Sequence, residues 1–136
     1  MKNENIKVVA GLIFQNNKLL ICQRPKFKDH SLKWEFPGGK IKKDETSEDA
    51  LIREIYEELS INIFNYNELI SYSFNYSDLG KAVFINFYLI KNFTGKILNN
   101  FHNQLKWIEI KDIREYDFLE GDLKIIDYIN SNEFKY

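Results

Sequence analysis

The first part of the chain is dominated by apolar runs that predict β-strands. Residues 6–14, IKVVAGLIF, form a β-branched run typical of a buried strand, and residues 19–23 are expected to return beside it as a hairpin. Gly11 inside the first run indicates a bulge or a close approach of another backbone. Residues 26–33 are polar and predict a loop, whose His30 is expected to be solvated.

Later strand-like segments are rich in aromatic residues. Residues 68–76 alternate apolar and polar positions, residues 77–80 form a turn signal, and residues 82–90 have the strongest strand pattern in the chain. These three segments predict a hairpin of long strands. Two shorter strands are expected at residues 93–98 and 104–110.

Helical periodicity appears in two places, with a short helical turn expected at residues 111–114. Thr46, followed by Asp49, fits a capping box, so a helix should begin at Ser47. A second helix is predicted at residues 121–130. The apolar stripe of the first helix consists of Leu51, Ile52, Ile55 and Leu59. This order of elements predicts an α/β chain in which a mixed sheet lies between helices, an α/β/α sandwich.

Three glutamates of the first helix, Glu54, Glu57 and Glu58, lie on a different face from its apolar stripe. Like charges at spacings of three and four residues destabilise a helix by roughly 0.2–0.5 kcal/mol per pair, so a merely solvated face would more often mix the signs. Three converging carboxylates suit a hard cation that prefers oxygen ligands, and Mg²⁺ is the expected ion. The alternative is a glutamate-rich surface helix with incidental spacing.

The stretch around these glutamates resembles the Nudix box, G-x5-E-x7-R-E-U-x-E-E-x-G-U, in which U is apolar. The matching residues are Gly39, Glu45, Arg53, Glu54, Ile55, Glu57, Glu58 and Ile61. Ser60 departs from the box, because the family has glycine there to end the helix in a left-handed turn. A serine at that position is expected to be strained by about 1 kcal/mol, or to shift the cap to Asn62.

The resemblance implies a single Nudix domain over residues 1–136. It also implies hydrolysis of a nucleoside diphosphate linked to another group, by attack of water on phosphorus. Glu54, Glu57 and Glu58, with the carbonyl of Gly38, would be the ligands of Mg²⁺, or of Mn²⁺. Arg53 would pair with a box glutamate and orient it.

Glu45 has two interpretations. By the resemblance it would support the loop or assist proton transfer, and by position alone it is a first-turn acid favoured by the helix dipole. Lys40 directly follows the glycine turn of Gly38 and Gly39, so it can act as a point charge on phosphate or be a solvated lysine.

Among Nudix subfamilies, the segments WEFPGGKI and DFLEGDLKII are most similar to the MutT group. That group cleaves nucleoside triphosphates to the monophosphate and pyrophosphate, and its members act on 8-oxo-dGTP, CTP or dCTP. The resemblance implies that Arg24, Phe74 and Asp122 face the base. Phe74 could instead be a core residue, and Asp122 could instead be an acid at the start of the last helix.

One departure concerns the catalytic base. In the MutT group an acid often precedes a histidine shortly before the tryptophan of the late strand. Here His102 is kept, but Phe101 replaces the acid. The base is therefore left open between the box acids and Glu45, and His102 is expected to make a structural hydrogen bond.

Composition limits the partners. A chain of 136 residues, 44% hydrophobic and with a net charge of −1, predicts one globular domain without the basic stripe of a nucleic-acid-binding protein. A nucleotide remains compatible, because a divalent cation can lie between its phosphates and the carboxylates. Cys22 is the only cysteine, which excludes an internal disulfide and suits a reducing, cytoplasmic location. No secretion signal is recognised, and no apolar run approaches the about 18 residues of a membrane span.

The oligomeric state, monomer or homodimer, is left open, and two alternative functions remain. The first is a Nudix enzyme acting on ADP-ribose, a nucleotide sugar or a dinucleoside polyphosphate, although the absence of proline after Pro37 argues against ADP-ribose. The second is a nucleotide-binding module without turnover. Phe101 and Ser60 favour that module, and the intact set of three helix glutamates opposes it.

Overall fold

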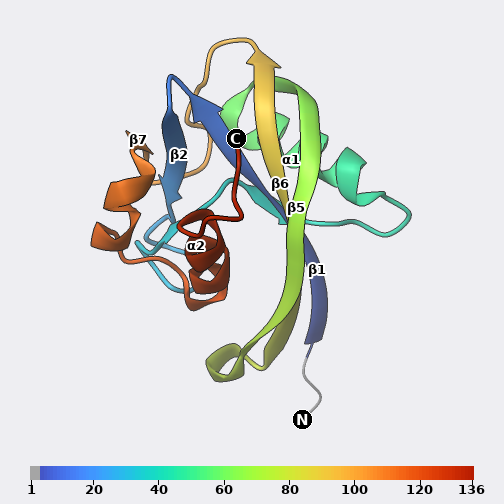
Figure 1. Cartoon of the computed structure of the whole chain (residues 1–136). Coiled ribbons are helices and arrows are strands. Elements are labelled where there is room, and N and C mark those ends of the chain that lie inside the picture. The colour runs from blue at the N-terminus through green and yellow to red at the C-terminus, as the bar shows by residue number, and fades with distance from the viewer. Residues whose placement is uncertain (1–3) are drawn as a thin grey trace.

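The structure is a computed structural model that describes residues 4–136, so the first three residues of the predicted domain lie outside it. Within this range, four strands precede the first α-helix, and three more strands precede the second (Figure 1). The elements are β1 (Glu4–Gln15), β2 (Lys18–Gln23), β3 (Trp34–Glu35), β4 (Gly38–Lys40), α1 (Ser47–Leu59), β5 (Asn62–Tyr76), η1 (Ser77–Leu79), β6 (Lys81–Thr94), β7 (Gln104–Ile108), η2 (Ile110–Glu115), η3 (Glu120–Asp122) and α2 (Leu123–Ile129).

Strand β1 is the centre of the sheet, because it has partners on both sides. It runs parallel to β6 and antiparallel to β2 and β4, while β5 continues the sheet beyond β6 and β3 beyond β2. Strand β7 also pairs with β2. Parallel and antiparallel pairs therefore occur in one sheet, as the order of elements predicts.

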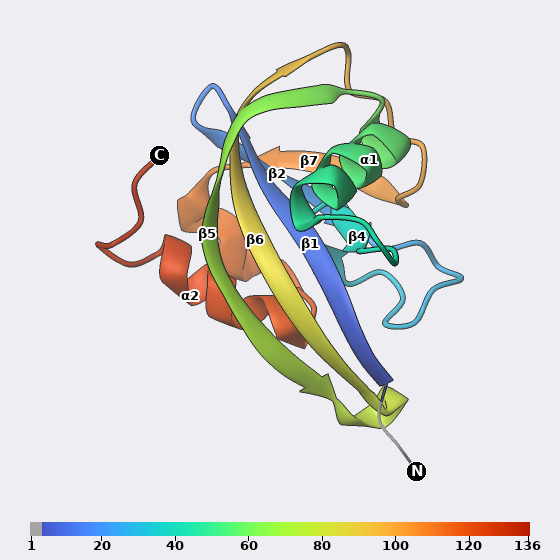
Figure 2. The ribbon, with the colours of Figure 1, turned by 90° about the vertical axis from the view of Figure 1, so that its right-hand side faces the viewer.

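The two helices cover opposite faces of the strands (Figure 2). Along β1, Val9 and Ile13 pack in one apolar cluster with α1, whereas Ala10 and Leu12 pack in a second cluster with α2. A strand covered on both faces is apolar at consecutive positions, which is why residues 6–14 form a continuous run. The predicted α/β/α sandwich is confirmed.

Strands β5 and β6 are longer than their sequence patterns indicate. Strand β5 begins at Asn62 rather than at residue 68, because polar residues on this sheet-edge strand hide the alternation. The separate strand predicted at residues 93–98 is wrong. Its first two residues end β6, where Thr94 pairs with Asn62, and the chain then turns at Gly95.

The long helix begins where the capping box predicts. The Thr46 side-chain oxygen accepts a hydrogen bond from the Asp49 N–H at 3.1 Å, and Ser47 is the first helical residue. The C-cap of the helix is Ser60, which takes the left-handed conformation with φ of 60°, as expected if serine is strained at this position. The cap is not shifted to Asn62.

A distant segment completes the C-terminal end of α1. The Leu98 N–H donates to the Leu59 carbonyl at 2.9 Å, and the Asn100 N–H donates to the Glu58 carbonyl at 3.0 Å. The Asn100 side-chain amide also donates to Ser60 Oγ at 2.7 Å. Carbonyls in the last turn of a helix have no partner inside the helix, so this segment satisfies groups that would otherwise be unpaired.

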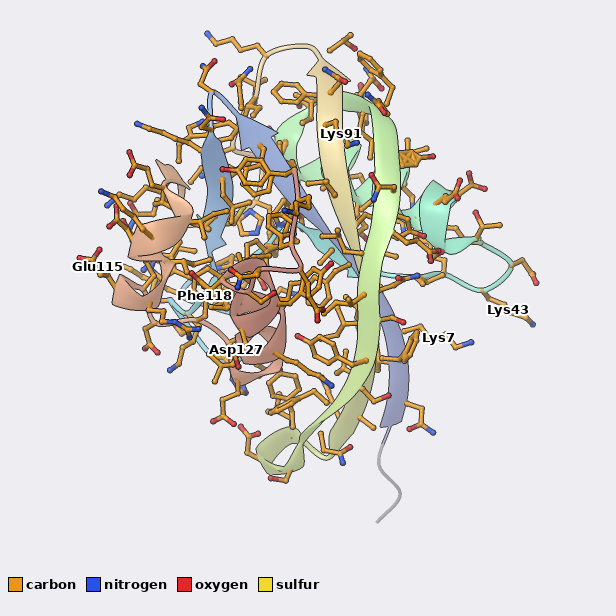
Figure 3. The ribbon with its side chains drawn as sticks, viewed as in Figure 1. Lys7, Lys43, Lys91, Glu115, Phe118 and Asp127 are labelled. Carbon is orange, nitrogen blue, oxygen red and sulfur yellow. The ribbon has the colours of Figure 1, made fainter. Side chains whose placement is uncertain are left out.

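The surface carries lysines on separate elements. Lys7 on β1, Lys43 in the loop before α1, and Lys91 on β6 are exposed (Figure 3). Phe118, by contrast, is buried in the cluster that α2 covers. Across residues 4–136, no helix combines the length and the apolar character needed to cross a bilayer.

The Ser60–Asn100 contact generates a stability prediction. Ser60→Ala keeps the left-handed strain and removes the hydrogen-bond acceptor, so it should lower the free energy of unfolding by about 1 kcal/mol. Ser60→Gly removes the same acceptor but relieves strain of about 1 kcal/mol, so it should stay within about 0.5 kcal/mol of the wild type. Denaturant unfolding measures both, and an alanine variant as stable as the glycine variant would contradict this account.

Candidate active site

A cavity of about 650 Å³ lies beside the last turns of α1. Glu54, Glu57 and Glu58 line it from the helix, and Gly38 and Gly39 line it from β4. Arg24 and Asp122 line the same cavity, although they are 98 positions apart in the sequence. The fold thus brings together the metal-ligand candidates and two of the residues predicted to face a base.

The glycine turn is shaped by close contacts with its neighbours. Gly38 has φ of 154°, and a Cβ atom there would collide with the Val9 carbonyl. A Cβ atom on Gly39 would overlap the carboxyl group of Glu54. Glycine is therefore required at both positions for the turn to lie against β1 and for Glu54 to lie against the turn.

Arg53 organises the acids at the site. Its Nε and Nη2 donate to the two carboxylate oxygens of Glu45 at 2.7 and 2.9 Å, and its Nη1 donates to Glu54 at 2.8 Å and to Glu57 at 3.3 Å. Nη2 also donates to the Lys40 carbonyl at 3.0 Å. One guanidinium therefore joins the loop before α1 to two of the box glutamates, and the predicted pairing with a box acid is present.

Glu45 acts as the anchor of this arginine. Both of its oxygens bind Arg53, and one also accepts the Lys42 N–H at 3.0 Å. The hydrogen bonds from Arg53, followed by that from Lys42, lower the pKa of Glu45 to about 2. These contacts support the loop-supporting interpretation of Glu45 over the helix-dipole one.

Glu58 lies deepest among the helix glutamates and accepts the Gly38 N–H at 3.1 Å. Burial, followed by the negative charge of Glu35, raises the pKa of Glu58 to about 9. Burial of this carboxyl therefore favours its neutral form in the absence of a nearby cation.

Sequence reasoning missed Glu35, which joins two predicted residues. Its carboxylate accepts from Arg24 Nη1 at 2.9 Å and lies 3.1 Å from His102 Nε2. His102 is buried, and the same nitrogen is 3.9 Å from Glu58. His102 thus makes a hydrogen bond, as predicted, but its partner is an acid of the site. One signal in the sequence pointed to Glu35, its position next to the glycine turn. Its contact with His102 could not be predicted, because the two residues are 67 positions apart.

Three of the four residues predicted to contact the substrate line the cavity, namely Arg24, Lys40 and Asp122. Among residues 4–136 the lining includes Tyr76 but not Phe74, whose ring packs against Tyr76 with centroids 4.8 Å apart. The strand alternation puts both aromatic residues on one face of β5 and gives no signal that distinguishes them.

His30 is a second residue whose place at the cavity the sequence did not predict. It was expected to be solvated, but it lines the cavity, lies 3.1 Å from an Asp78 oxygen, and packs edge-on against Tyr76. The polar loop that carries it therefore forms part of the cavity wall.

The acids fit a divalent cation in type and charge. Carboxylates and a backbone carbonyl are the ligands that Mg²⁺ prefers. Burial, and then the charge of Glu35, raises the pKa of Glu58, and a nearby cation would favour its ionised form. In the part of the chain that the structure describes, no three such side chains already converge on one point. Arg53 binds Glu54 and Glu57, so an ion shared by all three helix glutamates would require a side chain to rotate, and Glu57 is 53% exposed.

Known proteins resemble the chain over nearly its whole length. The family model of the NUDIX domain matches residues 5–129. A CTP pyrophosphohydrolase of Escherichia coli is 30% identical over 90% of this chain and 89% of its own, and an 8-oxo-dGTP diphosphatase of Buchnera aphidicola is 34% identical over 93% and 92%. A structure from a study of MutT of Aliivibrio salmonicida and Vibrio cholerae superimposes with a TM-score of 0.80, at 29% identity, over 93% of this chain and 97% of that one.

The Arg53–Glu45 pair predicts an acid-dependent stability. Because the pKa of Glu45 is lowered from 4.5 to about 2, the pair stabilises the folded state above about pH 4.5, and this contribution is lost as the pH falls toward about 2. The melting temperature of the wild type should exceed that of Glu45→Gln at neutral pH, and the difference should narrow over that interval. Glu109→Gln, an exposed acid away from Arg53, is the control. A difference independent of pH would contradict the prediction.

Proposed function

The chain belongs to the NUDIX family, and on that premise we propose that it is a MutT-like enzyme that hydrolyses nucleoside triphosphates to the monophosphate and pyrophosphate. The observation that carries the proposal is the position of Glu54, Glu57 and Glu58 in one cavity with Arg24 and Asp122. Polyphosphate chemistry and base recognition can then take place in the same space.

Mg²⁺, or Mn²⁺, is the proposed cofactor, held by these three glutamates and the carbonyl of Gly38. When bound, such an ion supplies positive charge that polarises a phosphoryl group and activates water. Arg53 binds Glu54, which lies against Gly39 of the glycine turn, and Lys40 at the cavity wall offers a point charge to phosphate.

The lowered pKa of Glu45 bears on which residue accepts the proton of the attacking water. A carboxylate with a pKa of about 2, bound to Arg53 through both oxygens, is a weak base, and among residues 4–136 Glu45 is not part of the cavity lining. We therefore assign Glu45 a positioning role and assign proton acceptance to the box glutamates. Phe101 also lines the cavity but has no group that can take a proton.

Asp122 is the proposed reader of the base. Burial, then the charge of Glu35, raises the pKa of Asp122 well above its ordinary value, while Arg24 lowers it. The result favours the neutral acid, which offers one donor and one acceptor, whereas the ionised form offers acceptors only. Cytosine presents a complementary acceptor and donor at N3 and N4, and 8-oxoguanine presents a donor and an acceptor at N7 and O6. Guanine presents two acceptors at its N7 and O6, which a neutral acid does not match.

A substrate panel tests the reaction. With Mg²⁺ the protein should release pyrophosphate from at least one nucleoside triphosphate, and Glu57→Gln should lower the turnover by at least about 100-fold, because a metal ligand is lost. Glu48→Gln, an exposed acid in the first turn of the same helix, is the matched control and should retain activity. Turnover of ADP-ribose alone, or tight binding of nucleotides without hydrolysis, would refute the proposal.

Two substitutions at Asp122 test base recognition. Asparagine keeps one donor and one acceptor, so Asp122→Asn should keep the preference among nucleotides within about threefold of the wild type. Asp122→Ala leaves the partner groups of the base unpaired, at a cost of about 1–3 kcal/mol, and should reduce the preference by roughly 5- to 150-fold. The ratio of kcat/KM values between the preferred and the next-best nucleotide is the measurement. If both variants lose the preference equally, the neutral acid of Asp122 does not bind the base.

A further inference from the structure

Asp122 stands at the N-cap of α2 but does not cap the helix. Within residues 4–136, its carboxyl makes no hydrogen bond to the backbone N–H groups of that helix. An aspartate at this position usually accepts a hydrogen bond from the second or third helical residue, which satisfies one of the free donors there. The carboxyl of Asp122 instead lines the cavity while remaining only 7% exposed.

Tyr72 satisfies the donor that Asp122 leaves. Its hydroxyl oxygen accepts the N–H of Ile125, the third residue of α2, at 3.2 Å. The same hydroxyl donates to the Gly121 carbonyl at 2.6 Å, and both hydrogen bonds are buried. A side chain from β5, 53 positions earlier in the sequence, therefore takes the capping role at the start of α2.

A second tyrosine of β5 fixes the same backbone. The Tyr76 hydroxyl accepts the Gly121 N–H at 2.9 Å, so tyrosine hydroxyls bind both polar backbone atoms of Gly121, directly before Asp122. A Cβ atom on Gly121 would collide with the Tyr76 hydroxyl, so only glycine allows this approach. The backbone that carries the Asp122 carboxyl is thus held from the sheet.

We propose that Tyr72 is a positioning residue for base recognition: by capping α2 in place of Asp122, it leaves the Asp122 carboxyl free to face the bound nucleobase. The inference rests on the proposed function, since it takes Asp122 as the group that meets the base. When Tyr72 loses its hydroxyl, the Ile125 N–H loses its partner, and the nearest acceptor able to replace it is the N-cap carboxyl itself. Asp122 then turns toward its own helix and away from the cavity.

Binding of nucleoside monophosphates without metal is the first test, with CMP, dGMP and 8-oxo-dGMP as probes. Tyr72→Phe should reduce the ratio of Kd values between the poorest and the best ligand by roughly three- to tenfold, the worth of one hydrogen bond. Tyr66→Phe removes a hydroxyl from the same strand, where it donates to Glu48 at 3.4 Å on the α1 side, and should leave the ratio unchanged. Combined with Asp122→Ala, Tyr72→Phe should lower the ratio no further than Asp122→Ala alone.

Thermal unfolding supplies a readout that does not depend on any ligand. In the wild type Asp122→Ala removes no cap, whereas in the Tyr72→Phe background it removes the substitute cap. Its effect on the melting temperature should therefore be more destabilising in that background, by about 3–5 °C.

Three results would overturn the proposal. They are equal weakening of all three monophosphates by Tyr72→Phe, a wild type that binds them all alike, and an effect of Asp122→Ala on melting that is the same in both backgrounds. Failure of the proposed reaction is separate from these. A wild type that discriminates among monophosphates but releases no pyrophosphate would refute the hydrolase and leave the role of Tyr72 standing.

Discussion

The crowding of carboxylates around one arginine is the constraint on which the site depends. Arg53 binds Glu45, Glu54 and Glu57 at once. Glu58 is buried, and within residues 4–136 it forms no ion pair with Arg53. The pKa values of these acids are therefore shifted in opposite directions, to about 2 for Glu45 and to about 9 for Glu58. Burial and charge, rather than residue type, decide which carboxyl is ionised.

The fold offsets this repulsion with apolar packing on the other side of α1. Leu51, Ile55 and Leu59 are fully buried against the strands, so the helix is fixed by one face while its acids share the other. Fully burying a leucine or isoleucine side chain contributes roughly 1.5–3 kcal/mol, against roughly 0.2–0.5 kcal/mol for a like-charge pair on a helix. The core therefore outweighs the repulsion by a wide margin.

Sequence reasoning succeeded where the determinants are local. The Thr46 cap and the glycine turn lie within one short stretch, so local spacing located them, and the resemblance of that stretch to the Nudix box implied the pairing of Arg53. It failed where distant segments meet. The Glu35–His102 and Tyr72–Ile125 contacts join segments more than 50 residues apart, and no periodicity encodes them. Tyr76, rather than Phe74, reaches the cavity because of the path of β5, which the alternation of the strand does not specify.

The hydrogen bond from Asn100 to Ser60 Oγ has a consequence for how such a sequence could arise. Ser60 offers an acceptor that glycine lacks, in addition to the Glu57 carbonyl, which also accepts from the Asn100 amide at 3.2 Å. The two positions are therefore not free to drift independently, since the effect of a replacement at one depends on the residue at the other. Asparagine at position 100 therefore gains one hydrogen bond when position 60 is serine and keeps its bond to the Glu57 carbonyl when position 60 is glycine.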